Sequence, residues 1–68
     1  MYRPQFESLY YEFANKSDSH HLALLVIEDM TTVEACNYLE QIIEHGSPYQ
    51  DEYYRWACEE ILVFMRGY

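Results

Sequence analysis

The sequence is poor in basic residues, in glycine and in proline. Its 68 residues include four Lys and Arg against twelve Asp and Glu, a formal net charge of −8. Because phosphate groups are neutralised by Lys and Arg, we expect no direct binding to nucleic acid or to a membrane surface. Two glycines and two prolines leave no segment with the composition of a linker. We therefore expect one small acidic domain spanning residues 1–68.

Long apolar segments and cysteine pairs are also lacking. The longest uncharged apolar run, residues 22–27, is far shorter than the roughly 20 residues that cross a bilayer. The first residues show no apolar signal region. Cys36 and Cys58 are too few for a disulfide framework, and their number leaves open whether they pair. These absences favour a cytoplasmic protein.

Apolar and aromatic residues, in contrast, are abundant. Half of the residues are hydrophobic and 18% are aromatic, including eight tyrosines, which is more than a disordered acidic tail would carry. The chain should therefore fold. A domain of this length buries only roughly 60% of the surface of its unfolded chain, which leaves little apolar area for an enclosed substrate pocket. We therefore expect no enzyme.

The apolar spacing predicts helices in the first half of the chain. Phe6, Leu9, Tyr10 and Phe13 recur at intervals of three and four, which predicts a helix over residues 4–15 with these side chains inside. A second helix should start near Ser19, within the cluster of short polar residues 15–19. Its run 22–27 is apolar all round, so we expect it in the middle of the fold. No second strand-like run is present to pair with it as a strand.

Two further helices are predicted from their start and stop signals. Thr31 and Glu34 fit a capping box, and His45-Gly46 would end that helix. Ser47, Pro48 and Gln50 repeat the start signal for a last helix that runs to Arg66, with Gly67 as its stop.

The buried faces of these two helices follow from their periods. The third helix should bury Ala35, Cys36, Leu39, Ile42 and Ile43. The fourth should bury Tyr53, Tyr54, Ala57, Cys58, Ile61, Phe64 and Met65. The predicted fold is a compact all-α four-helix bundle with short loops and antiparallel neighbours, or three longer helices with one short helix.

The acidic residues are patterned on this fold. The outward face of the third helix comprises Glu34, Asn37, Glu40, Gln41 and Glu44, with no basic residue among them. The fourth helix adds carboxylates that include Glu52 and Glu59. Such a face either keeps the protein in solution or receives a cationic partner. The size of the net charge on so short a chain favours the second interpretation.

Several aromatic side chains are predicted to lie outside the core. Tyr11 falls off the apolar face of the first helix, and Tyr49 lies at the start of the last. Trp56 and Val63, seven residues apart, share one side of the last helix beside carboxylates. Either a neighbouring helix covers them or they form an apolar anchor ringed by acidic residues, the pattern of a binding hot spot.

Active-site chemistry finds little support. His20 and His21 are adjacent and point about 100° apart on a helix, so they cannot hold one metal ion from one face. Cys36 falls on a buried stripe and is interpreted as a core thiol. No phosphate-binding loop or dinucleotide fingerprint is present. We expect no catalytic residue, no metal and no cofactor.

In size, charge and aromatic content, the chain is similar to the small acidic inhibitors that phages and mobile elements direct against nucleic-acid enzymes. These include anti-CRISPR and anti-restriction proteins; bacteriocin immunity proteins are similar in the same respects. The similarity, carried by composition rather than by a motif, implies an inhibitor or modulator that mimics nucleic acid. Its partner would be the basic surface of a nuclease or another nucleic-acid-binding protein.

The candidate binding residues combine charge with apolar area. The set comprises Glu34, Glu40, Glu44, Glu52 and Glu59 for charge, and Tyr11, Tyr49 and Trp56 for apolar contact. The alternative hypothesis is a structural or regulatory adaptor whose aromatic surface pairs with a second copy, forming a helical homodimer.

Overall fold

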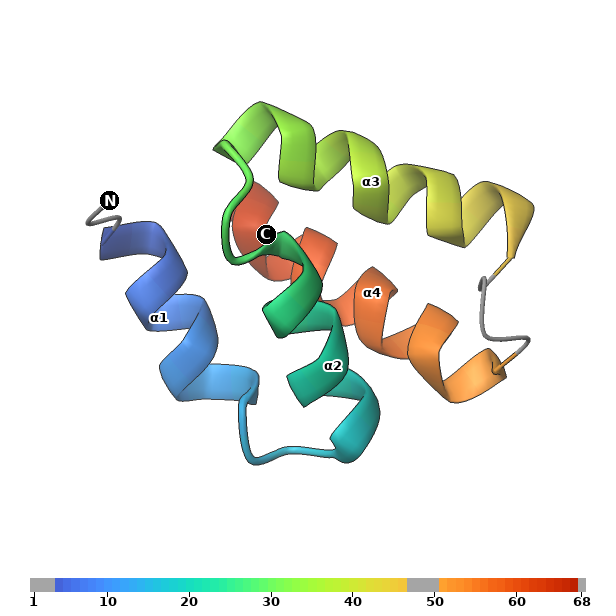
Figure 1. Cartoon of the computed structure of the whole chain (residues 1–68), viewed down its shortest axis with the longest axis horizontal. Helices are drawn as coiled ribbons and strands as arrows, with labels where there is room; N and C mark the ends of the chain where they lie inside the picture. The colour runs from blue at the N-terminus through green and yellow to red at the C-terminus, as the bar shows by residue number, and fades with distance from the viewer. Residues whose placement is uncertain (1–3, 47–50, 68) are drawn as a thin grey trace.

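Helix-start residues divide the chain into four helices. The computed structural model describes residues 4–46 and 51–67. In chain order, the helices are α1 (Pro4–Phe13), α2 (Asp18–Ile27), α3 (Thr32–His45) and α4 (Glu52–Arg66) (Figure 1). The predicted all-α four-helix bundle is confirmed. Two helices have ten residues and two have 14 and 15, rather than three being long and one short.

The helix caps follow the predicted chemistry at most positions. Ser17 caps α2, two residues before the predicted start, because its Oγ accepts the His20 N–H at 3.1 Å. The capping box of Thr31 and Glu34 is confirmed by hydrogen bonds in both directions. Gly46 closes α3 at φ 92°, a left-handed value that favours glycine.

The start of α4 differs from the prediction. Residues 47–50, which include the predicted cap Ser47, lie outside the described residues. Asp51 has extended backbone and its side chain accepts the Tyr53 N–H at 3.0 Å, so the helix begins at Glu52. An Asp carboxylate is a strong N-cap, which explains why α4 starts directly after Asp51. The end is as predicted, with Gly67 in the left-handed conformation after Arg66.

Helix α4 is the centre of the fold. It packs against α1, α2 and α3, while α1 and α2 lie side by side as a hairpin (Figure 1). The radius of gyration, 10.8 Å, equals the value of about 11 Å expected for a compact domain of this length. The core comprises Leu9, Phe13, Ala23, Leu24, Ile27, Ala35, Leu39, Ile42, Tyr54, Cys58, Ile61 and Leu62.

The prediction that α2 lies in the middle of the fold is wrong, because α4 occupies that place and one side of α2 is exposed. Leu22 and Leu25 are exposed, whereas His20 is one of the buried residues. Neighbouring helices cover one face of α2, and the helical period turns His20, Leu24 and Ile27 toward them. The apolar run therefore predicted the helix correctly but not which of its side chains are buried.

The predicted inner faces of α1 and α4 were too wide. Tyr53 and Phe64 in α4 and Tyr10 in α1 are exposed. Leu62, which the prediction left out, is buried instead of Tyr53 and Phe64. Each of these three side chains lies at the edge of the apolar face of its helix. The neighbouring helices cover only the middle of that face, so the side chains at its edge stay exposed.

Polar contacts join α4 to α3. Arg55 Nε donates to the Ile43 carbonyl at 2.9 Å, and the hydroxyls of Tyr38 and Tyr54 are 2.6 Å apart. Arg66 forms an ion pair with Glu40. Within the described part of the chain, no buried side-chain nitrogen or oxygen lacks a hydrogen-bond partner. None of the four helices has both the length and the apolar character needed to cross a membrane.

Candidate protein-binding surface

The side of α4 that faces away from the core carries exposed aromatic and aliphatic side chains. Tyr53 is 68% exposed, Trp56 49% and Val63 48%. Their spacing of three and seven residues places them along one side of the helix, which we call the α4 outer face. The Tyr53 and Trp56 rings meet edge to face with centroids 5.4 Å apart. No neighbouring helix covers this side fully, so the interpretation as an apolar anchor stays open.

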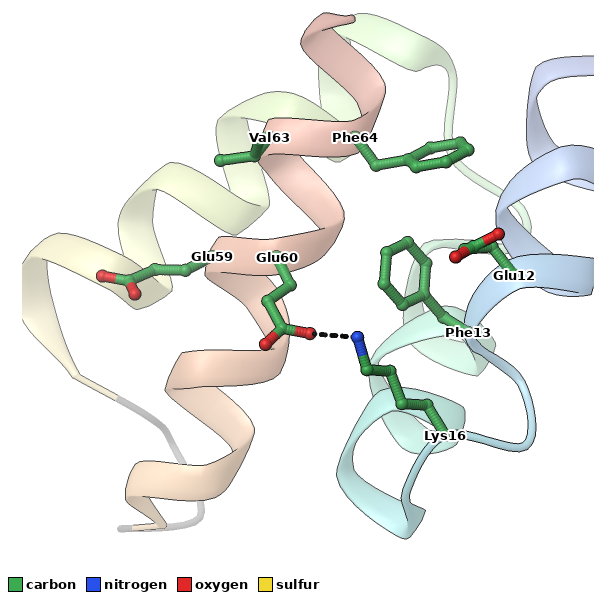
Figure 2. A pocket seen from close by; sticks show the side chains of 7 residues that line it. All are labelled: Glu12, Phe13, Lys16, Glu59, Glu60, Val63 and Phe64. Carbon is green, nitrogen blue, oxygen red and sulfur yellow. Dashed lines mark ion pairs between the residues drawn. The ribbon is translucent and has the colours of Figure 1, made fainter. Parts of the chain in front are cut away.

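A hollow lies between α1 and α4, beside the outer face. Its volume is about 380 Å³. The lining residues are Glu12, Phe13, Lys16, Glu59, Glu60, Val63 and Phe64. Figure 2 shows Glu12 on the α1 side and Glu59 on the α4 side, with the Phe13 and Phe64 rings between the two helices. We call this feature the α1–α4 hollow.

An aromatic contact forms the wall of the hollow. The rings of Phe13 and Phe64 meet edge to face, with centroids 5.4 Å apart and planes at 84°. Phe13 is buried and stacks on its other side against the His20 imidazole, at 5.5 Å. Phe64 remains partly open to solvent. The wall is therefore firm on the α1 side and accessible on the α4 side.

Glu60, which lines the hollow, is the centre of a chain of polar contacts that extends beyond it. The His20 Nε2 donates to Glu60 Oε1 at 2.8 Å, and Lys16 Nζ is 3.2 Å from the same oxygen. Since Nε2 then carries the proton, Nδ1 accepts the Ser17 hydroxyl at 2.6 Å. The hydrogen bond from His20, then that from Lys16, lowers the pKa of Glu60 below its usual 4.5.

Ser17, His20 and Glu60 are also the residue types of a nucleophilic triad. Here Ser17 Oγ serves as the N-cap of α2 and accepts the backbone N–H of His20. Neither Ser17 nor His20 lines the α1–α4 hollow, so a substrate there would not meet the hydroxyl. We interpret this chain of contacts as structural, joining the α1–α2 turn to α4.

The basic side chains of the described residues are all engaged in contacts between helices or along α4. Lys16 pairs with Glu60, and Arg66 pairs with Glu40. Arg55 donates to a backbone carbonyl of α3 and lies 3.8 Å from Glu52. The remaining basic residue, Arg3, lies outside the described residues. Lys16, Arg55 and Arg66 are therefore each bound to a group of the protein itself.

The carboxylates predicted to bind a partner are distributed unevenly between paired and unpaired states. Glu34 is part of the capping box, and Glu44 lies 3.7 Å from the His45 imidazole. Glu52 and Glu40 face Arg55 and Arg66. The α3 face carries no basic residue of its own, as the sequence shows, but Arg66 of α4 reaches its edge.

Glu59 differs from the other predicted carboxylates. It has no ion-pair partner among residues 4–46 and 51–67, and the same is true of Glu12 on the opposite side of the hollow. Sequence reasoning did not include Glu12, Lys16 or Phe64 in the surface. Their spacing relative to α4 carried no signal, since only the packing of α1 brings them there.

The predicted Tyr11 does not join this surface. Tyr11 is 92% exposed and lies at a different hollow between α1 and α2, which is lined by Phe6, Glu7, Tyr10, Tyr11, Leu25 and Glu28. The predicted contact Tyr49 lies outside the described residues. Trp56 lies on the α4 outer face with Val63, which also lines the α1–α4 hollow.

The two cysteines are free thiols in different surroundings. Cys58 is fully buried in α4, and burial raises the pKa of its thiol to about 12. Cys36 packs at the edge of the core. Within the described ranges, no three His, Cys, Asp or Glu side chains gather as metal ligands.

Comparison with known proteins finds no matching family model, no similar curated protein and no similar solved structure. The observations that bear on the function of this protein are therefore those of its own surface.

Proposed function

We propose that this protein is an anionic helical interaction module that binds the basic surface of a nucleic-acid-handling protein and modulates or inhibits it. The observation that supports the proposal is the use of Lys16, Arg55 and Arg66 in contacts within the fold. With a net charge of −8, the surface then presents carboxylates that lack a counter-charge.

This arrangement suits a partner that grips nucleic acid. Such proteins line their binding channels with Lys and Arg, and those channels attract any rigid anionic body. Charge complementarity raises the association rate and makes it dependent on salt. The exposed aromatics of the α4 outer face would supply the short-range apolar contacts.

The test is a capture experiment with the immobilised protein and extract of its native host. Captured proteins are identified by mass spectrometry after washes at low and moderate salt. A duplex DNA or RNA oligonucleotide is then added as competitor. We expect a nucleic-acid-binding protein that is released both by salt and by the oligonucleotide. A captured protein that resists both treatments would contradict the proposal.

A charge-reversed variant tests the electrostatic part directly. Glu44→Lys with Glu59→Lys should slow association with the captured protein and reduce its salt dependence. The matched variant, Glu44→Asp with Glu59→Asp, keeps both charges and should bind as the unchanged protein does. Equal association rates for the two variants would sink the electrostatic account.

A homodimeric adaptor is the second candidate, favoured by the exposure of Tyr53, Trp56 and Val63. Sedimentation over a range of protein concentrations tests it. A species that stays monomeric at high concentration removes this candidate and leaves the first unaffected.

A further inference from the structure

We propose that the α1–α4 hollow is the docking site for a segment of the partner in which arginines flank apolar residues. The proposal rests on the proposed function and specifies the part of the partner that the hollow receives.

The charge around the hollow selects a cation. Three carboxylates, Glu12, Glu59 and Glu60, line it together with a single basic residue, Lys16. Since Lys16 pairs with Glu60, the other two carboxylates, which have no ion-pair partner among the described residues, leave a net charge of −2. Glu12 stands on the α1 side, and Glu59 leaves α4 on the side of Val63, away from α1 (Figure 2). A segment that lies in the hollow and continues over α4 therefore meets Glu12 first and Glu59 beyond Phe64.

The middle of the hollow selects apolar side chains. Phe64 and Val63 line it and are partly exposed. Phe64 is held by its edge-to-face contact with the buried Phe13, so it offers a fixed ring. An arginine suits such a boundary because its aliphatic stem packs on the ring while its planar guanidinium forks toward a carboxylate. Lysine would supply the charge without that fork.

The occupant of the hollow is indicated by its lining, not by its size. Its volume of about 380 Å³ falls within the range for small-molecule sites, roughly 300–1,000 Å³, and the site is open to solvent. It continues into the α4 outer face, because Val63 belongs to both. The segment could thus extend along α4 toward Trp56, a residue type common in binding hot spots.

A second copy of this chain is a poorer occupant. Each copy carries a net charge of −8, and pairing the hollow with the same surface would bring Glu59 and its equivalent into one interface. Like charges brought together in this way oppose association. A cationic segment has the opposite effect.

The experiment uses short synthetic peptides as probes. In each, two arginines flank one to three leucines, and in the matched peptides citrulline, an uncharged isostere, replaces both arginines. Binding to the whole protein is followed by NMR of backbone amides and by fluorescence of Trp56, the single tryptophan. We expect shifts at Glu12, Val63 and Phe64, and affinity at least about tenfold lower for the citrulline peptides. Equal affinity of both peptide sets, or shifts confined to other elements, would overturn the proposal.

Two double variants separate the hollow from the general charge of the protein. Glu12→Gln with Glu59→Gln should weaken binding of the arginine peptides about tenfold. Glu7→Gln with Asp29→Asn changes the net charge equally, away from the hollow, and should weaken it less than about threefold. Equal losses in both would attribute the affinity to the overall field and refute the docking site.

The outcomes also distinguish this proposal from the proposed function. If the hollow variant still captures the same nucleic-acid-binding protein as before, the docking site is wrong while the function stands. If the arginine peptides bind at the hollow but no nucleic-acid-binding protein is captured, the function is wrong while the specificity of the hollow stands.

Discussion

The two sides of α4 are closed to different degrees. Toward α3, the 14-residue partner helix packs Ala35, Leu39 and Ile42 into the core, and polar contacts from Tyr54, Arg55 and Arg66 hold the edges. Toward α1, the neighbouring helix has ten residues and contributes Leu9 and Phe13 to the core, with the Phe13–Phe64 ring pair and, from the turn that follows α1, the Lys16–Glu60 ion pair. The hollow lies on this second side.

The difference shows how a very small domain can offer a binding surface. A long helix with polar contacts at its edges uses its carboxylates within the fold, as Glu40 does with Arg66. A short helix leaves part of α4 uncovered, and Glu12 and Glu59, which line the hollow there, have no ion-pair partner within residues 4–46 and 51–67. The predictions below compare the two sides, from the largest expected effect to the smallest.

Phe13→Ala should have the largest effect, because Phe13 is a large buried core residue of α1 that contacts both α2 and α4. Its ring contacts Phe64 and His20 and lies under Lys16. We expect the free energy of unfolding to fall by about 3–5 kcal/mol, a large part of the roughly 3–10 kcal/mol expected for a chain of this length. Urea unfolding measures the loss, with Phe13→Leu as a milder variant. A loss below about 1 kcal/mol would mean that α1 is not held by this ring.

Tyr54→Phe should have an intermediate effect on the α3 side. The substitution keeps the buried ring and removes the hydrogen bond between the Tyr38 and Tyr54 hydroxyls. The expected loss in the free energy of unfolding is about 1 kcal/mol. Tyr11→Phe is the matched control, since the Tyr11 side chain is almost fully exposed, and should change stability by less than about 0.5 kcal/mol. Equal losses in the two variants would mean that the hydrogen bond between Tyr38 and Tyr54 does not stabilise the packing of α3 on α4.

Glu60 should give the smallest effect, visible as pH dependence. Its folded-state pKa is lowered from 4.5 by His20 and Lys16, so its stabilisation is present above about pH 4.5 and is lost as the pH falls through the lowered value. Half of this side chain is open to water, which limits the size of the effect. Urea midpoints measured from neutral to acidic pH should fall less steeply for Glu60→Gln than for the unchanged protein. The neighbouring Glu59→Gln should keep the slope; an equal flattening in both would contradict the role of the His20 contact.

Local chemistry explains why the helices could be predicted from the sequence. A capping box depends on residues three apart, and Thr31 with Glu34 behaves as that motif requires. Gly46 and Gly67 end helices because they take left-handed backbone values. The sequence offers a start signal at Ser47 as well as one at Asp51, and the prediction chose Ser47, so it missed the Asp51 cap that precedes α4.

The candidate surface was only partly predictable, because it joins residues from separate helices. The period of α4 predicted that Trp56 and Val63 share a side, and Glu59 was included beside them. Glu12 and Lys16 come from the end of α1 and the turn that follows. Nothing in their own segment indicates that they meet Glu60 or Phe64, since that contact spans more than 40 positions of the chain.

By itself, the sequence determined the helical fold, the helix ends and the acidic excess, because caps, apolar periods and charge counts depend on residues close together in the chain. Only the tertiary structure decided which carboxylates stay unpaired, because that depends on where Lys16, Arg55 and Arg66 reach across the packed helices. The same packing buried His20 and left Phe64 at the edge of a hollow, since ten residues of α1 cannot cover the whole length of α4.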